Sequence, residues 1–142
     1  MDNNICITGL GIICSIGNDA ASVLDSLREG RPGIGSIKYL ETRHSHLPVG
    51  EVQLSDDQMK EILGIEGSEP MSRTSLMGAI AVRQVLEQAG ITDISGKRVA
   101  LISGTTVGGM DLTEKYFERM KTDDSLLYLP QSNECGKSTL EI

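Results

Sequence analysis

The feature that most constrains the fold is a strand, turn and helix pattern over residues 5–30. Residues 5–9 are short, apolar and rich in β-formers, which is typical of a strand buried on both faces. A glycine-containing stretch over residues 11–17 would then turn the chain tightly. Asn18 is a good N-cap for a helix over residues 20–29, and Gly30 is placed to end that helix in the left-handed conformation. This order of elements predicts the opening of an α/β unit.

The rest of the chain adds one further strand and several helices. Residues 34–54 are predicted to be a long connection with one short extended piece. A small helix between Ser55 and Gly64 has a capping box and a hydrophobic staple, and a long, mostly buried helix follows over residues 69–89. Residues 99–103 predict a second buried strand, a helix begins near Asp111, and a last one begins at Ser132 or Asn133. Two strands separated by helices favour a parallel, helix-layered but incomplete sheet.

Composition excludes several classes of function. The length of 142 residues suits one domain, and the net charge of −7 argues against a nucleic-acid surface, which needs a dense basic patch. Cys6, Cys14 and Cys135 contain no Cys-x-x-Cys pair, which argues against a disulfide scaffold or a structural zinc site and favours a reducing cytoplasm. The uncharged run over residues 3–18 lacks a basic n-region and is too short to span a bilayer, so no membrane segment is expected.

Two glycine clusters partly match nucleotide-binding loops. Gly9 and Gly11 lack the third glycine of the dinucleotide fingerprint, because Cys14 stands at its position, and a tight turn out of a strand is the favoured interpretation. Gly104 and Gly109 have phosphate-loop spacing, but Met110 replaces the lysine that reaches the phosphates. A third segment, GKS at residues 136–138, has Gln131 in place of the first glycine. No cofactor is therefore expected.

The remaining candidates for chemistry are two histidines and three cysteines. His44 and His46 could share one face of an extended segment and bind a metal, with Glu41 the nearest carboxylate, but a solvated loop pair is favoured. Cys135 has no histidine nearby in the sequence, and Cys6 is expected to be a small buried hydrophobe in the first strand. No metal site and no catalytic residue are expected in the chain.

Four segments taken in order resemble a known family. Residues 5–18 read ICITGLGIICSIGN, and residues 30–34 read GRPGI after a helix. Residues 71–73 read MSR before an alanine-rich helix that ends at Ala89 and Gly90, and residues 99–110 read VALISGTTVGGM. The order and spacing of these blocks are similar to those of the β-ketoacyl-acyl carrier protein synthases, whose opening pattern is roughly V-x-I-T-G-x-G-x-x-S-P-x-G.

The resemblance implies the N-terminal portion of a thiolase-like fold, with mixed sheets layered with helices, in a protein that is usually dimeric. It implies a decarboxylating Claisen condensation of acyl and malonyl groups held on an acyl carrier protein. The family's nucleophile is a cysteine in a Thr-Ala-Cys-Ser-Ser-type turn, and two histidines and a lysine follow later. None of these motifs is present, so residues 1–142 are expected to be one domain truncated before the nucleophile turn, inactive alone and able to self-associate.

Two details of the resemblance concern binding. Val107 matches a position in the glycine turn that lines or borders the acyl pocket near the dimer partner, although an ordinary buried valine is an equal alternative. Many bacterial members carry basic residues upstream of the Met71 position that meet the acidic carrier protein, whereas residues 66–70 read EGSEP here. The usual docking patch is therefore in doubt, or lies in residues beyond Ile142.

The leading hypothesis is an N-terminal fragment of a 3-oxoacyl-[acyl-carrier-protein] synthase of fatty-acid or polyketide-type synthesis. The alternative is a non-catalytic partner subunit of the same fold, similar to a chain-length factor. The two hypotheses differ at the residue that occupies the nucleophile turn, and a small standalone binding domain is the default if neither holds.

Overall fold

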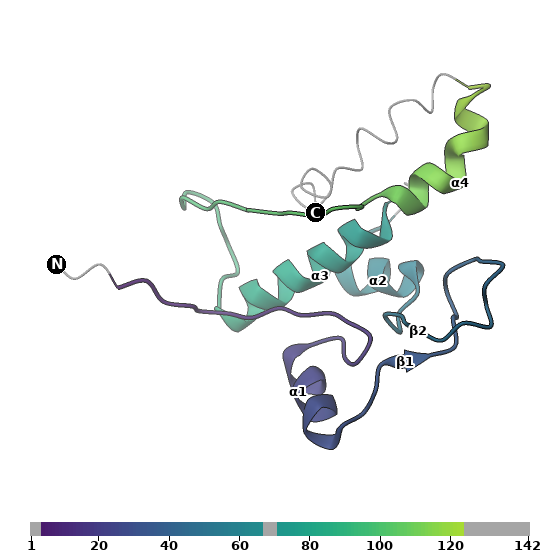
Figure 1. Cartoon of the computed structure of the whole chain (residues 1–142). Coiled ribbons are helices and arrows are strands. Elements are labelled where there is room, and N and C mark those ends of the chain that lie inside the picture. Colours follow the sequence, from purple (N-terminus) through teal and green to yellow (C-terminus); the bar gives the residue numbers. More distant parts are fainter. Residues whose placement is uncertain (1–3, 67–70, 124–142) are drawn as a thin grey trace. The chain divides into compact units, whose positions relative to one another are not determined.

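The computed structural model describes residues 4–66 and 71–123 (Figure 1). Its elements in chain order are α1 (Ala20–Glu29), β1 (Ile34–Gly35), β2 (Val49–Gly50), α2 (Asp56–Leu63), α3 (Arg73–Gln88) and α4 (Met110–Met120). The chain forms two compact units, of which the first comprises Met1–Ser55 and Ile80–Asp93 and the second comprises Asp56–Ala79 and Ile94–Ile142. Helix α3 begins in the second unit and ends in the first.

Helix α1 has the bounds that the sequence predicts, but its N-cap lies one residue later than expected. Asp19, not Asn18, has the extended backbone of an N-cap, with φ −156° and ψ 170°. Its side chain accepts a hydrogen bond from the Ser22 amide at 2.7 Å, while the Ser22 hydroxyl oxygen accepts from the Asp19 amide at 3.2 Å. Gly30 ends the helix in the left-handed conformation, with φ 65°, as predicted.

The N-terminal segment of the first unit runs beside the last part of α3 (Figure 1). The backbone amide of Ile12 donates to Gln84 Oε1 at 2.9 Å, and that of Leu10 donates to Gln88 Oε1. Glycine is required here: a Cβ on Gly11 would lie 1.9 Å from the Ala81 carbonyl oxygen. Small residues thus let an extended segment approach the helix backbone.

The expectation of a buried strand over residues 5–9 is wrong for the described structure. These residues have no strand hydrogen bonding, and Ile5 and Ile7 are 100% and 85% exposed. Cys6 is also exposed, contrary to the small buried hydrophobe expected. The physical reason is that a strand requires a neighbour for its backbone hydrogen bonds. In the described part of the chain, the hydrogen bonds from the N-terminal segment to α3 begin only at Leu10 and Ile12, beyond residues 5–9, and they go to side chains rather than to a neighbouring strand.

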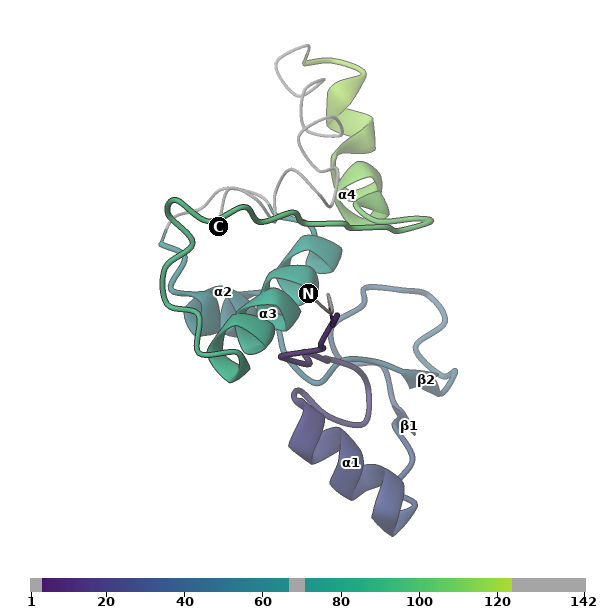
Figure 2. The same cartoon turned by 90° about the vertical axis from the view of Figure 1, so that its left-hand side faces the viewer.

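The sheet of the first unit lies in the segment predicted as a long connection. β1 and β2 pair antiparallel, with Ile34 opposite Gly50 and Gly35 opposite Val49 (Figure 2). The single short extended piece expected between residues 34 and 54 is thus two short strands. Among the described residues this is the one sheet, so the parallel arrangement predicted from the sequence is wrong there.

The second unit is built from helices. Met59 and Leu76 are fully buried, and Ala79 and Leu112 are nearly so. Met59 therefore anchors α2 in the core, whereas Ile62 on the same helix is exposed. Gly64, with φ 71°, follows α2 as predicted, and Gly90, with φ 67°, follows α3.

The second predicted strand, over residues 99–103, is also not observed. These residues have no regular secondary structure, and Ile102 is 95% exposed. The helix predicted from Ser132 or Asn133 lies outside the described residues. No helix in the described part of the chain combines the length and apolarity needed to cross a membrane.

Candidate functional site

The glycine turn over residues 104–109 leads directly into α4. Gly109 is buried, precedes the helix with φ 84°, and has no side chain with which to cap it. Its carbonyl oxygen instead accepts the first helical bond from the Thr113 amide at 3.2 Å. A positive φ of this size is costly for a residue with a Cβ, so the local sequence requires glycine at this position.

Contacts within the turn also hold its conformation. The Met110 amide donates to the Val107 carbonyl oxygen at 3.4 Å. A Cβ on Gly108 would lie 2.6 Å from Thr105 Cγ2, so the chain folds back tightly on Thr105. A Cβ on Gly104 would meet nothing within 4 Å, and this glycine has an ordinary φ. The constraint therefore lies in the second half of the turn.

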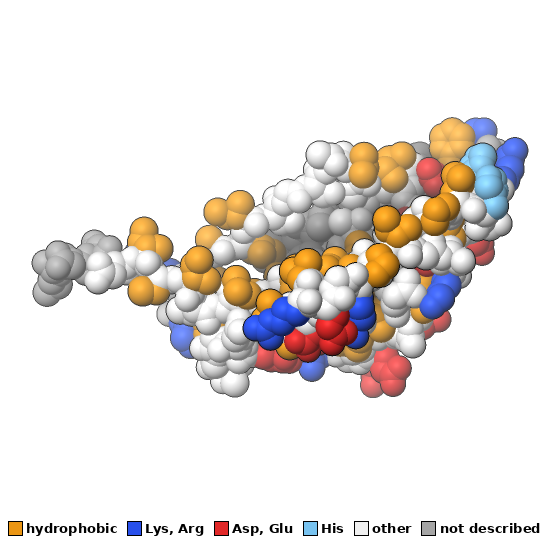
Figure 3. Space-filling model, turned by 60° about the horizontal axis from the view of Figure 1, so that its bottom comes forward, with side chains coloured by type: hydrophobic (Ala, Val, Ile, Leu, Met, Phe, Trp, Pro, Cys, Tyr) orange, Lys and Arg blue, Asp and Glu red, His pale blue; other side chains and the backbone are white. Residues whose placement is uncertain are grey.

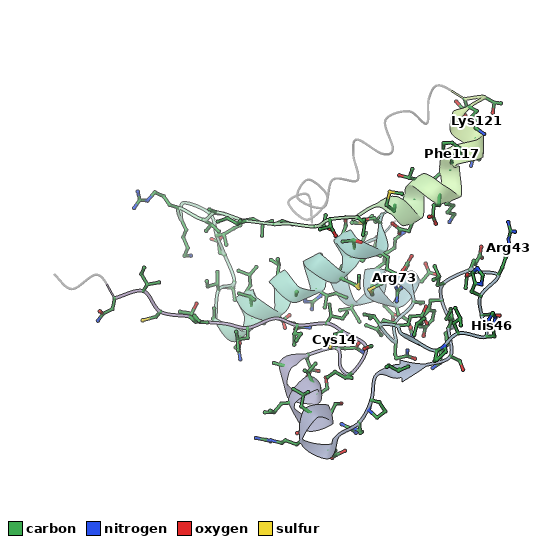
Figure 4. The ribbon with its side chains drawn as sticks, in the orientation of Figure 1. Cys14, Arg43, His46, Arg73, Phe117 and Lys121 are labelled. Atoms are coloured by element: carbon green, nitrogen blue, oxygen red, sulfur yellow. The ribbon has the colours of Figure 1, made fainter. Side chains whose placement is uncertain are left out.

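An aspartate at the start of α4 connects this helix to α3. Asp111 Oδ2 accepts a hydrogen bond from the Arg73 backbone amide at 2.9 Å, and Arg73 is the first residue of α3. The Arg73 guanidinium donates to Asp56 Oδ1 at 2.7 Å, and Asp56 is the first residue of α2 (Arg73 in Figure 4). The sequence predicts a helix that begins near Asp111; α4 begins one residue earlier, at Met110, and the Asp111 carboxylate accepts a hydrogen bond from the first amide of α3. These two contacts therefore link the N-terminal ends of α2, α3 and α4.

Val107 is 71% exposed in the turn. The alternative of an ordinary buried valine is therefore wrong for the described structure. Its role in lining an acyl pocket stays a prediction. With two apolar methyl groups and no polar atom, the side chain can contribute contact area and shape to a binding site but no acid, base or nucleophile.

The other candidate residues do not assemble into a site. His44 and His46 lie together in an exposed loop, with ring centroids 6.1 Å apart in an edge-to-face arrangement. Within residues 4–66 and 71–123, no group of three histidine, cysteine or acidic side chains is placed to hold a metal ion. Cys14 is half-buried, with its backbone paired to that of Gly17. Cys135 and the GKS segment lie outside the described residues.

The pKa of the Asp19 carboxyl reflects its structural role at the start of α1. The hydrogen bonds from the Ser22 backbone amide and hydroxyl lower the pKa of Asp19 below its ordinary value of 3.8. This is the ordinary effect of a cap that stabilises the ionised carboxylate, and Asp19 lies at the exposed start of α1. It indicates a helix cap and no catalytic acid.

A side chain fixes the backbone of the loop that contains residues 38–40, in a stretch that the sequence predicts to be a surface loop. The Glu51 carboxylate accepts hydrogen bonds from three successive backbone amides, those of Lys38, Tyr39 and Leu40, at 2.8 to 3.2 Å. The sequence signal available was a cluster of basic residues at positions 38–46 in an acidic chain. The backbone contacts of Glu51 have no sequence signature.

Comparison with known proteins gives consistent results over almost the whole chain. A family model described as "Beta-ketoacyl synthase, N-terminal domain" matches residues 2–138. Nodulation protein E of Rhizobium meliloti (strain 1021) is 32% identical over 129 residues, which cover 87% of this chain and 31% of that protein. The 3-oxoacyl-[acyl-carrier-protein] synthase 1 of Escherichia coli (strain K12) is 35% identical over 106 residues, covering 72% and 25%.

A third relative agrees with these two. The 3-oxoacyl-[acyl-carrier-protein] synthase 2 of Vibrio harveyi is 30% identical over 113 residues, covering 78% of this chain and 27% of that protein. The chain thus spans less than a third of the length of these curated relatives.

Proposed function

The chain belongs to the β-ketoacyl synthase family, and from this we propose that the whole protein is a 3-oxoacyl-[acyl-carrier-protein] synthase. The observation that carries the proposal is the family match over residues 2–138, together with relatives that are named as such synthases. The glycine turn supports it, because the SGTTVGG sequence at residues 103–109 forms a conformationally fixed turn into a helix.

The proposed reaction is a decarboxylative Claisen condensation. An acyl group is transferred from the thiol of a carrier protein to an enzyme cysteine. Loss of carbon dioxide from a malonyl thioester then leaves an enolate, whose carbon attacks the acyl carbonyl carbon and expels the cysteine thiolate. Hydrogen-bond donors that stabilise the enolate oxygen would lower the barrier to decarboxylation.

These 142 residues are proposed to contribute scaffold and pocket wall to that reaction and no catalytic group. The Thr-Ala-Cys-type turn that the family resemblance requires is absent from the sequence. We therefore expect the 142-residue chain alone to release no carbon dioxide from malonyl thioesters. The whole protein is proposed to act as a homodimer in the cytoplasm with an acyl carrier protein as its partner.

The test is a condensation assay on the whole protein. Radiolabelled malonyl thioester and an acyl thioester should yield a 3-oxoacyl product and carbon dioxide. Replacement of the cysteine at the nucleophile turn by alanine should abolish acyl transfer. Absence of turnover with every thioester would contradict the proposal. A residue other than cysteine at that turn, with activity only in the presence of a second subunit, would establish the chain-length-factor alternative instead.

The proposed pocket role of Val107 has its own test. Val107→Phe should shorten the longest acyl chain that the whole protein accepts while the rate with short acyl chains is retained, because a larger side chain fills pocket volume. The matched control is Thr106→Val, an exposed neighbour in the same turn. An unchanged chain-length profile for the Val107→Phe protein would contradict the pocket role.

A further inference from the structure

The loop over residues 38–46 carries an excess of basic side chains in an acidic protein. Lys38, Arg43, His44 and His46 lie there with one acidic residue, Glu41, while the chain as a whole has a net charge of −7. All five side chains are exposed. We call this loop the basic loop. Figure 3 shows the histidines at the surface, and Figure 4 shows Arg43 and His46 projecting outward from the loop.

The acidic side chain beside the basic loop is directed to the backbone. Glu51 accepts hydrogen bonds from the amides of residues 38–40, so its carboxylate is engaged with main-chain dipoles. The Lys38 ammonium group donates to the neutral Gln53 Oε1 at 2.7 Å. In the part of the chain that the structure describes, no carboxylate is within ion-pair distance of the Arg43 guanidinium. The cation at position 43 is therefore available to an external anion.

Apolar side chains lie among these basic side chains. Tyr39, Leu40 and Leu47 are exposed, Leu40 by 60%. Apolar area bordered by positive charge matches a partner whose surface combines apolar and carboxylate side chains, because apolar contact supplies affinity and charge complementarity supplies orientation and association rate. Guanidinium and imidazole N–H groups both donate hydrogen bonds to carboxylates.

We propose that the basic loop is a docking surface for an acidic protein and, resting on the proposed function, that this protein is the acyl carrier protein. The stretch at residues 66–70, EGSEP, carries two acidic residues and no basic one, so it is unsuited to an acidic partner. The basic loop supplies the complementary charge elsewhere in the chain. Glu51 serves the surface indirectly by fixing the backbone from which Lys38, Tyr39 and Leu40 project.

The test measures binding of purified holo-acyl carrier protein to the whole protein by titration at several salt concentrations. Charge reversal by Arg43→Glu should weaken binding by roughly three- to tenfold and flatten its salt dependence, as expected for a charge at the edge of an interface. Arg28→Glu is the matched control, because Arg28 is an exposed arginine on α1 that makes a weak contact with Asp25 at 3.8 Å. The control should bind as the unaltered protein does.

A second measurement separates this inference from the proposed function. Acyl and malonyl pantetheine thioesters require no carrier docking, so Arg43→Glu should leave their turnover unchanged while it raises the KM for carrier-bound substrates. Equal carrier affinity in the Arg43→Glu and Arg28→Glu proteins would overturn the docking surface even if condensation occurs. Loss of turnover with the unaltered protein and all thioesters would instead overturn the proposed function. Circular dichroism of each variant checks that the fold is retained.

Discussion

At the scale of single residues, Gly11 shows how closely the N-terminal segment approaches α3. An added Cβ would lie 1.9 Å from the Ala81 carbonyl oxygen and 2.8 Å from its carbonyl carbon. These atoms belong to a helix backbone, so they cannot rotate aside as the end of a flexible side chain can. The absence of a side chain at position 11 is therefore a packing requirement.

Gly11→Ala should destabilise the protein by about 1–3 kcal/mol, the usual cost of forcing an extra carbon into a tightly packed contact. Urea unfolding followed by circular dichroism measures this change. Gly35→Ala is the control, because a Cβ there meets nothing within 4 Å and Gly35 does not need a left-handed backbone. Equal midpoints for the two variants would show that the segment does not pack on α3 in this way.

Asp19 predicts a pH dependence for α1. The pKa of its carboxyl is lowered from 3.8 by the bonds from Ser22, so the folded state favours the ionised form. The resulting stabilisation is complete above the unfolded pKa and is lost as pH falls through the lower, folded pKa.

Asp19→Ala should reduce stability by about 1 kcal/mol at neutral pH, the typical value of an N-cap. Asp19→Asn should retain much of the capping stabilisation, since its amide oxygen can also accept a hydrogen bond from the Ser22 amide. It should lose the pH dependence of stability that Asp19 contributes, because the amide does not titrate. Thermal unfolding between about pH 6 and pH 3 should therefore bring the unaltered and Asp19→Asn proteins closer together as pH falls. A constant difference across this range would contradict the assignment.

At the scale of elements, helices were predicted well and strands were not. Helix α1 has its predicted bounds, and α2 and α4 begin within a residue or so of the predicted positions, whereas α3, predicted over residues 69–89, is observed as Arg73–Gln88. The backbone hydrogen bonds of a helix close within a few residues, so caps and apolar spacing specify it locally. A strand needs a partner that sequence periodicity does not identify, and residues 5–9 and 99–103 have no such partner among the described residues.

The difference between local and long-range contacts also explains which parts of the candidate site the sequence predicts. The glycines of residues 104–109 indicated a tight turn, because only glycine suits the φ of 84° at Gly109. The contact from Asp111 to the Arg73 amide joins residues far apart in sequence, and no local pattern specifies it. The hydrogen bonds of Glu51 are missed for the same reason.

Glu51 gives a prediction for one connecting segment. Glu51→Ala should raise the hydrogen-exchange rates of the amides of residues 38–40 by roughly tenfold or more, because each loses a hydrogen bond to a charged acceptor. Gln53→Ala removes the contacts to the Lys38 ammonium group and to the Glu51 carbonyl oxygen but keeps the Glu51 carboxylate that bonds these amides, so it is the matched control. Unchanged exchange in the Glu51→Ala protein would show that the carboxylate does not hold this segment.

At the scale of the whole molecule, apolar side chains are left exposed in both units. Ile5 and Ile7 in the first unit and Val99 and Ile102 in the second lie in the segments predicted as strands. Segments of this composition, with unsatisfied strand backbone, associate readily with other chains. The 142-residue chain studied alone should therefore bind a hydrophobic dye and elute from size exclusion above its monomer mass of 15.3 kDa.

Ile7→Lys should reduce that association and the dye fluorescence, because it removes exposed apolar area and places a charge in an uncharged segment. Asn4→Lys separates these two effects, since it adds the same charge to the same exposed segment and removes no apolar side chain. If apolar contact drives association, light scattering should give a lower mass for Ile7→Lys than for Asn4→Lys. Equal reduction in both variants would assign the effect to charge repulsion, and a dye-silent monomer from the unaltered chain would contradict the prediction entirely.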